Sequence, residues 1–208
     1  MTRILLCLTT TALVSACALP KENTLNRADF RAAEADDAFA RNLDFTPADR
    51  IPPGEATYEG TVHSDAIVNG VDDFKVLGDL ELSVDIAEAG SRAGTSDVTG
   101  SITNLNLFDD AENGFDDQRL GGTLTLSGRT DGGRIDARAT GVVDAVVADT
   151  IGRQSATWQL DLDGDFRDNF ENADVVSGDV SGGTVGGSTD DYDVLLTGDG
   201  GFFGERQD

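Results

Sequence analysis

The sequence predicts an all-β protein, a small antiparallel up-and-down β-barrel of about eight strands that follows an N-terminal signal and a partly helical tether. From about Ala56 onward, apolar and polar residues alternate with a period of two, the pattern of half-buried strands. The chain holds 25 glycines, and its apolar runs are separated by turn residues. No interval between these runs has room for a crossover helix, so consecutive strands should pair antiparallel.

The charge of the chain excludes one class of partner. Asp and Glu number 39 against 15 Lys and Arg, which gives a formal net charge of -24. Binding of nucleic acid needs clustered basic residues that neutralise phosphates, and this surface would repel a polyanion. We therefore expect no nucleic-acid partner, and we interpret the acidic surplus as a source of solubility.

Residues 1–16 have the layout of a secretory signal peptide, because Arg3 precedes a short apolar run and small residues. The four residues around the end of this segment, Val14-Ser15-Ala16-Cys17, resemble the lipobox of bacterial lipoproteins. The resemblance implies cleavage before Cys17, acylation of Cys17 and a membrane partner through that lipid. Ala18 in place of Asp implies the outer membrane, with the periplasmic and exposed faces both open. An ordinary cleaved signal with an incidental cysteine is the alternative.

After such processing no thiol is left for a disulfide or a metal. Cys7 leaves with the signal and Cys17 carries the lipid, and the chain has no other cysteine. We therefore expect no zinc or other thiol-bound metal site and assign no cofactor, whereas weak calcium binding by acidic loops stays open.

Residues 17–55 are expected to form a lipidated tether with a possible helix. Ala and Glu favour the helix, and Asn23 or Thr24 could cap it. Its weak apolar stripe consists of Leu25, Phe30, Ala33, Phe39 and Leu43. Prolines at 47, 52 and 53 end the segment. The helix is transient or docked, and a spacer role and a partner-binding role are both open.

Residues 56–208 are expected to form the barrel. The clearest strand alternates Phe74, Val76, Gly78, Leu80, Leu82, Val84 and Ile86 on one face with Lys75, Leu77, Asp79, Glu81, Ser83 and Asp85 on the other. Similar runs start at Tyr58, Val98, Leu120, Ile135, Ala156, Val176 and Tyr192. Glycines at 78, 100, 122, 128, 141 and 178 fall on the inward face, which suits a small, strongly bent barrel. A two-sheet sandwich and a membrane-spanning barrel are the alternatives.

The C-terminal stretches Val176–Gly183 and Gly198–Glu205, behind a lipobox and a glycine-rich barrel, resemble the barrel lobe of transferrin-binding protein B and related surface lipoproteins. The resemblance implies a binding lipoprotein connected with capture of iron, haem or a host protein. Glu205 stands where that family has Pro, and Asp208 ends the sequence before the family's final strand. An open barrel, or one closed in a different register, is therefore expected.

Several side chains are weighed as candidates for chemistry. His63 is the only histidine and has no nucleophile motif near it, so we interpret it as a solvent-facing strand residue. Asp161, Asp163 and Asp165 begin like a calcium loop but lack its later ligands, and on a strand they would line the outer face. The remaining candidates are acidic pairs that could bind calcium weakly, at 109–110, 116–117 and 190–191.

Basic residues are rare, and three of them surround the hairpin turn at 130–133. Arg129, Arg134 and Arg138 could contact a carboxylate or a haem propionate, but pairing with acids on neighbouring strands is the simpler interpretation. No set of residues predicts catalysis. The sequence therefore predicts a non-catalytic, anchored binding module for a protein or haem, and a structural envelope lipoprotein without a soluble ligand is the alternative.

Overall fold

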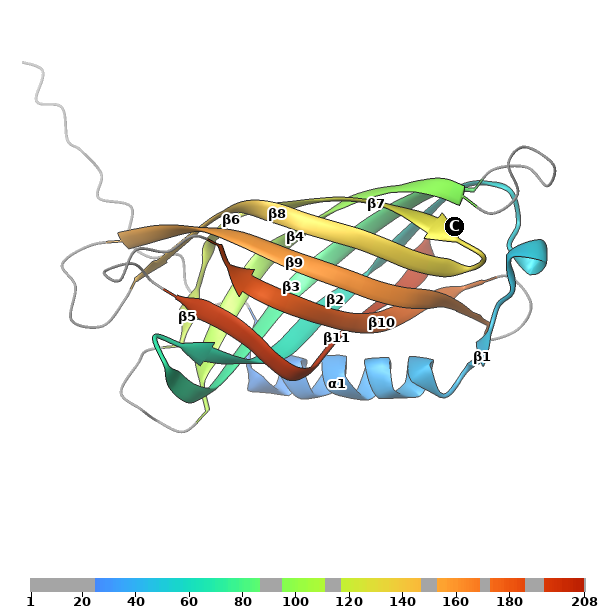
Figure 1. The fold of residues 1–208 in the computed structure, drawn as a ribbon. Helices are drawn as coiled ribbons and strands as arrows, with labels where there is room; N and C mark the ends of the chain where they lie inside the picture. Colours follow the sequence, from blue (N-terminus) through green and yellow to red (C-terminus); the bar gives the residue numbers. More distant parts are fainter. Residues whose placement is uncertain are drawn as a thin grey trace, which may run out of the picture.

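The computed structural model describes residues 25–86, 95–110, 117–146, 153–168, 173–185 and 193–207. These residues form a closed β-barrel with an α-helix packed along the outside of its wall (Figure 1). The all-β prediction is confirmed.

Eight strands form the ring of the barrel. Each pairs antiparallel with the next along the ring, and the order follows the chain, so the up-and-down barrel is confirmed over the sandwich. The strands are β2 (Gly54–Val68), β3 (Val71–Ile86), β4 (Thr95–Asp109), β7 (Leu124–Asp131), β8 (Arg134–Val146), β9 (Arg153–Asp168), β10 (Val175–Thr184) and β11 (Val194–Gln207).

The barrel is closed by β11, which pairs with β2 from Val194 opposite Val68 to Gln207 opposite Thr57. Of the two alternatives expected from the sequence, the open barrel is therefore wrong. The stretch Gly198–Glu205 lies within the closing strand itself, with an irregularity between Thr197 and Gly201. Closure removes exposed strand edges from the ring.

Side chains fill the interior of the barrel. Its largest fully buried members include Trp158, Tyr58, Phe74, Phe166 and Phe202, and all belong to one apolar cluster. Most charged residues of the same strands are exposed on the outer face, as alternation predicts, and Asp109 at the end of β4 is a buried exception. This polarity is the opposite of that in a membrane-spanning barrel, whose apolar face looks outward.

Glycine permits close approach between strands on the inward face. A Cβ added at Gly100 would overlap the carbonyl oxygen of Glu81, and one at Gly141 would overlap that of Thr123. At these positions the neighbouring strand approaches more closely than a side chain would allow, as expected for a small barrel.

Helix α1 (Arg27–Arg41) begins at an N-cap different from the predicted one. The Asn26 side chain accepts hydrogen bonds from the backbone N–H groups of Ala28 and Asp29, and Asp29 accepts one from the Asn26 N–H. This is a reciprocal capping box. Asn23 and Thr24, the predicted caps, lie outside the described residues.

Helix α1 is docked on the outer wall of the barrel, which settles the choice between a transient and a docked helix. Its first half packs Phe30 and Ala33 against Leu77 and Phe108, and its last turn packs Ala40 in a second cluster completed by Val175, Phe203 and Leu43. Phe39, expected in the apolar stripe, is instead 55% exposed on the far side of the helix.

The remaining elements are short, and they either connect the helix to the barrel or pair with the ends of barrel strands. They are β1 (Asp44–Phe45), which pairs with β9, the 3-10 helix η1 (Ala48–Arg50), β5 (Gln118–Arg119) and β6 (Gly121–Gly122). No helix in the described part of the chain is long and apolar enough to cross a membrane.

Candidate functional site

A buried polar group separates the two apolar clusters beneath α1. Asp37 on the helix and His63 on β2 are each about 5% exposed, and Nε2 of His63 lies 3.8 Å from Oδ2 of Asp37. Arg41, one turn further along, donates from Nε to the same Oδ2 at 2.8 Å. Its two other nitrogens reach Oδ1 of Asp179 and the carbonyl oxygen of Gly178, each at 2.7 Å. The guanidinium therefore ties the helix to β10.

Burial sets the charge states of this group. Burial, reinforced by the nearby Arg41 and only partly opposed by Asp65, lowers the pKa of His63 to about 4, so the imidazole is neutral at pH 7. Burial raises the pKa of Asp37 above its usual value, although Arg41 opposes that rise. The contact of His63 with Asp37 at neutral pH is thus between a carboxyl group and a neutral ring, and the ionic partner of Asp37 is Arg41.

The interpretation of His63 as a solvent-facing residue is wrong. Its side chain does point outward from β2, as the alternation predicts, but α1 covers that part of the wall and Phe30 packs edge-on against the ring at 5.8 Å. Nδ1 of His63 and Oδ1 of Asp37 are buried without a hydrogen-bond partner among the described residues. A covered imidazole of this kind has no access to a substrate.

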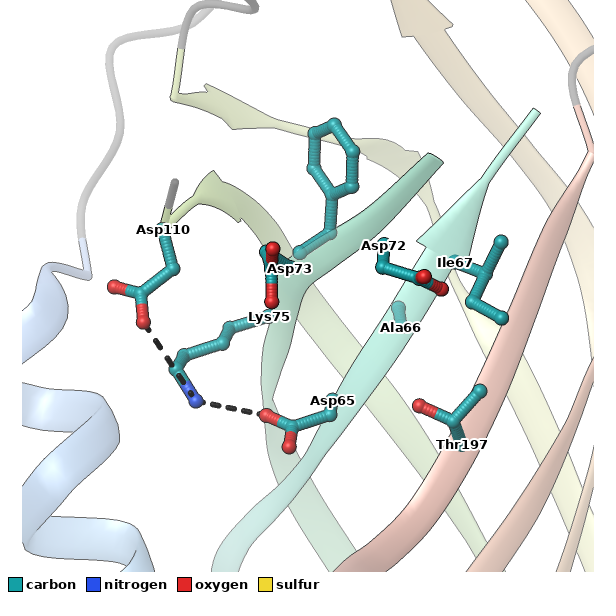
Figure 2. Close-up of a pocket in the computed structure, with 9 residues that line it drawn as sticks. Asp65, Ala66, Ile67, Asp72, Asp73, Lys75, Asp110 and Thr197 are labelled. Atoms are coloured by element: carbon teal, nitrogen blue, oxygen red, sulfur yellow. Dashed lines mark hydrogen bonds and ion pairs between the residues drawn. The ribbon is translucent and has the colours of Figure 1, made fainter. Parts of the chain in front are cut away.

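An open groove of about 340 Å³ lies on the outer wall beside this buried group, and Figure 2 shows it. Its lining comes from β2, β3, β11 and the end of β4, and it carries four carboxylates and one amine. The lining residues are Asp65, Ala66, Ile67, Asp72, Asp73, Phe74, Lys75, Asp110 and Thr197. An acidic excess of this kind suits a cationic group of a ligand.

Lys75 is the only cation among the groove residues, and acids hold it in place. Its Nζ lies 2.7 Å from Oδ1 of Asp65 and 4.0 Å from Oδ2 of Asp110, as the dashed lines in Figure 2 show. It also lies 4.7 Å from the centre of the Phe30 ring on α1. Burial would lower the pKa of Lys75, but the hydrogen bond to Asp65 and the charges of Asp65 and Asp110 outweigh it and raise that pKa. The amine therefore stays charged.

The start of α1 is bound to the two ends of the acidic segment 109–117. Nη2 of Arg27 donates to the carbonyl oxygen of Asp109 at 2.6 Å and to Oδ1 of Asp117 at 3.3 Å, and its Nε lies 3.8 Å from Asp110. Asp117 also accepts from the Asp109 N–H at 3.0 Å. These acids therefore position the helix and the groove, whereas Asp116 and the pair 190–191 lie outside the described residues.

The aspartates of β9 line the outer face of the barrel, as predicted. Arg138 Nε bonds Asp161 Oδ1 at 2.6 Å, and Arg134 Nη2 bonds Asp163 Oδ1 at 3.2 Å. Cross-strand pairing of the basic residues is confirmed, and Arg129 likewise lies 3.8 Å from Asp136. Among the described residues, no group of three or more His, Cys, Asp or Glu is arranged to hold a metal ion.

Sequence reasoning missed Asp37 and Arg41, although their spacing carried a signal. An acid followed by a base four residues later shares one helix face. Leu77, Phe108 and Phe203 gave a second signal, because they are apolar residues on the otherwise polar outward side of their strands. Together these two signals indicate that a helix covers this part of the outer wall of the barrel. Cys17, the predicted lipid-attachment residue, lies outside the described residues.

Comparison of this chain with models of known protein families, with curated proteins and with solved structures finds no match.

Proposed function

We propose that this chain is an outer-membrane lipoprotein, anchored by acylation of Cys17, whose barrel is a non-catalytic binding module. The support for the anchor is the order of Arg3, the apolar run and the box Val14-Ser15-Ala16-Cys17 at the N-terminus. Two or more acyl chains hold a protein stably on a membrane, where one chain does not. The resemblance to transferrin-binding protein B supports the same class.

The groove beside Lys75 is the observation that carries the binding role. The interior of the barrel is occupied by packed apolar side chains, so a ligand has to be met on the outer wall and loops. The groove is a concave part of that wall, and Asp65 and Asp110 fix its one amine. Arg27 connects the side of the groove at Asp109 and Asp110 to the start of α1.

A protein partner with a basic segment fits the groove better than haem does. Four carboxylates would repel haem propionates, whereas they would attract lysine or arginine side chains. The arginines around the 130–133 hairpin, the other candidates for propionate contacts, are engaged by aspartates of neighbouring strands. Of the ligands that the sequence suggested, we therefore favour capture of a protein.

Capture of partners by the intact lipoprotein tests the binding role. Envelope proteins are cross-linked in living cells and recovered with the wild type, with Asp72→Asn/Asp73→Asn, and with the matched pair Asp97→Asn/Asp131→Asn on exposed sites of β4 and β7. We expect a defined partner that is lost with the first pair and kept with the second. Equal recovery by both pairs would overturn the choice of groove, and absence of any partner together with an envelope defect on deletion would favour the structural alternative.

The anchor is tested separately by Cys17→Ala, which should release the protein from the membrane fraction. Retention of this variant in membranes would overturn the lipid anchor.

Absorbance of the purified protein mixed with haem tests haem as the alternative ligand, and we expect no change in the haem spectrum.

A further inference from the structure

Three of the large apolar side chains that the barrel leaves exposed lie near one of its ends. Val142 on β8 is 56% exposed, Val185 just after β10 is 51% exposed, and Leu195 on β11 is 53% exposed. Ile67 on β2 is half-buried beside them. An exposed aliphatic residue is ordinary when it stands singly, whereas neighbouring exposed aliphatic residues are candidates for a contact surface.

The strand pairing places these residues in one diagonal row across five strands. Val142 is opposite Thr157 of β9, and the Val185 N–H donates to the Thr157 carbonyl oxygen at 2.8 Å. Leu195 is opposite Gly183, two residues before Val185, and on its other side it is opposite Ile67. We call Val142, Thr157, Val185, Leu195 and Ile67 the apolar row. It contains no charge.

The apolar row lies at the end of the barrel where the described chain begins. Strands β2, β4, β8 and β10 all finish at this end, because alternate strands of an up-and-down barrel run the same way. Arg27, the first residue of α1, bonds the backbone of Asp109, the last residue of β4. Figure 1 shows the start of α1 and the hairpin between β2 and β3 at the same end.

The distance to the proposed lipid is short. Asn26, the N-cap of α1, stands nine positions after Cys17. An extended chain spans at most about 3.6 Å per residue, so this segment reaches about 30 Å. An acyl group at Cys17 would therefore hold this end of the barrel near the bilayer, with the opposite end facing away.

We propose that the apolar row rests on the bilayer to which Cys17 attaches the protein. This inference depends on the proposed lipid anchor. Exposed Val, Leu and Ile side chains gain free energy by entering the boundary between headgroups and acyl chains, and the row itself carries no charged side chain that would have to be desolvated. The acidic groove shares Ile67 with the row and extends from it toward β3 and the end of β4, so its carboxylates lie at the edge of the contact and face a partner there.

A single fluorescent probe tests the contact. Full-length Leu195→Cys is expressed with its own signal, and the lipidated protein is labelled with an environment-sensitive fluorophore. It is then reconstituted in phosphatidylethanolamine and phosphatidylglycerol vesicles, with or without doxyl-labelled phosphatidylcholine. Phe39→Cys, 55% exposed on the outer side of α1, is the matched control. We expect the probe at 195 to shift to the blue and to lose emission in doxyl vesicles, and the probe at 39 to do neither.

Three other outcomes would overturn the proposal, and each has a different meaning. Vesicle-bound protein with an unquenched probe at 195 would leave the anchor standing and remove the contact. A blue shift that grows with protein density but resists doxyl lipid would indicate a second copy on the row. A mass spectrum that shows unmodified Cys17 would remove the anchor and the contact together.

Discussion

The carboxylate of Asp37 on α1 occupies the space that a side chain at position 201 of β11 would need. A Cβ built on Gly201 would overlap Oδ2 of Asp37 and crowd the ring of His63. The absence of a side chain at this position therefore allows the helix to lie against the wall with its one buried acid facing the barrel. The docking of α1 therefore involves this pair of residues as well as the apolar clusters at the two ends of the helix.

The first prediction is that Gly201→Ala loosens α1. The added methyl group has to displace Asp37, and overpacking of this kind costs about 1–3 kcal/mol. Urea unfolding should show the loss of stability, and hydrogen exchange should be faster in the amides of α1 than in those of the barrel. Gly204→Ala on the same strand is the control, because its Cβ would approach no atom closer than 3.1 Å. Equal effects of the two variants would contradict the role of Gly201.

The sequence predicts which side chains of the strands face inward, but it does not predict which outward side chains the helix covers. Alternation depends only on neighbouring residues, so it correctly assigned Trp158, Leu160 and Leu162 to the interior. It also correctly assigned Asp161, Asp163 and Asp165 to the outer face. It could not assign His63, because whether an outward side chain meets solvent depends on a helix that begins 36 positions earlier in the sequence. Closure of the barrel depends on the pairing of β11 with β2, across almost the whole domain, and no local pattern encodes it.

The second prediction concerns acid. The pKa of His63 is about 4 in the folded protein against an ordinary value of 6.5, because α1 buries it. The unfolded chain therefore binds this proton more readily, so the stabilisation is complete above pH 6.5 and is lost as the pH falls toward 4. The difference in pKa corresponds to about 3 kcal/mol at most. Asp37 acts in the opposite direction, because its raised pKa favours the folded state as it becomes protonated.

His63→Gln separates the histidine from the many titrating acids. Denaturant unfolding of wild type and variant between pH 7 and pH 4 should give a stability difference that changes in favour of the variant as the pH falls. The acids of the barrel contribute equally to both proteins and cancel. A stability difference that stays constant over this range would mean that His63 titrates normally and is not covered by α1.

The third prediction is that Asp37 and Arg41 act as a unit. Arg41→Met leaves the carboxylate of Asp37 buried without its cation, which should cost about 1–2 kcal/mol, since Arg41 is itself 38% exposed and partly screened. Asp37→Asn relieves that penalty, so the double variant should be more stable than the sum of the single effects by about 1 kcal/mol. Unfolding by urea completes the cycle. Additive effects would show that the two side chains do not interact.

The fourth prediction compares two surface arginines, Arg138, which joins two strands, and Arg27, which joins α1 to the barrel. Arg138 joins neighbouring strands whose pairing is already fixed by backbone hydrogen bonds, so Arg138→Ala should leave the free energy of unfolding almost unchanged. Arg27→Ala should change the global stability equally little, because its ion pairs are also exposed. However, Arg27 connects the start of α1 to both ends of the 109–117 segment. Hydrogen exchange at the Asp109 amide, which donates to Asp117, should therefore become faster in Arg27→Ala and stay unchanged in Arg138→Ala.

Arg27→Ala should also weaken capture of the partner while the fold stays intact, because Arg27 contacts Asp110 and Asp110 lines the groove. Unchanged exchange at Asp109 together with unchanged capture would show that the groove keeps its shape without the helix.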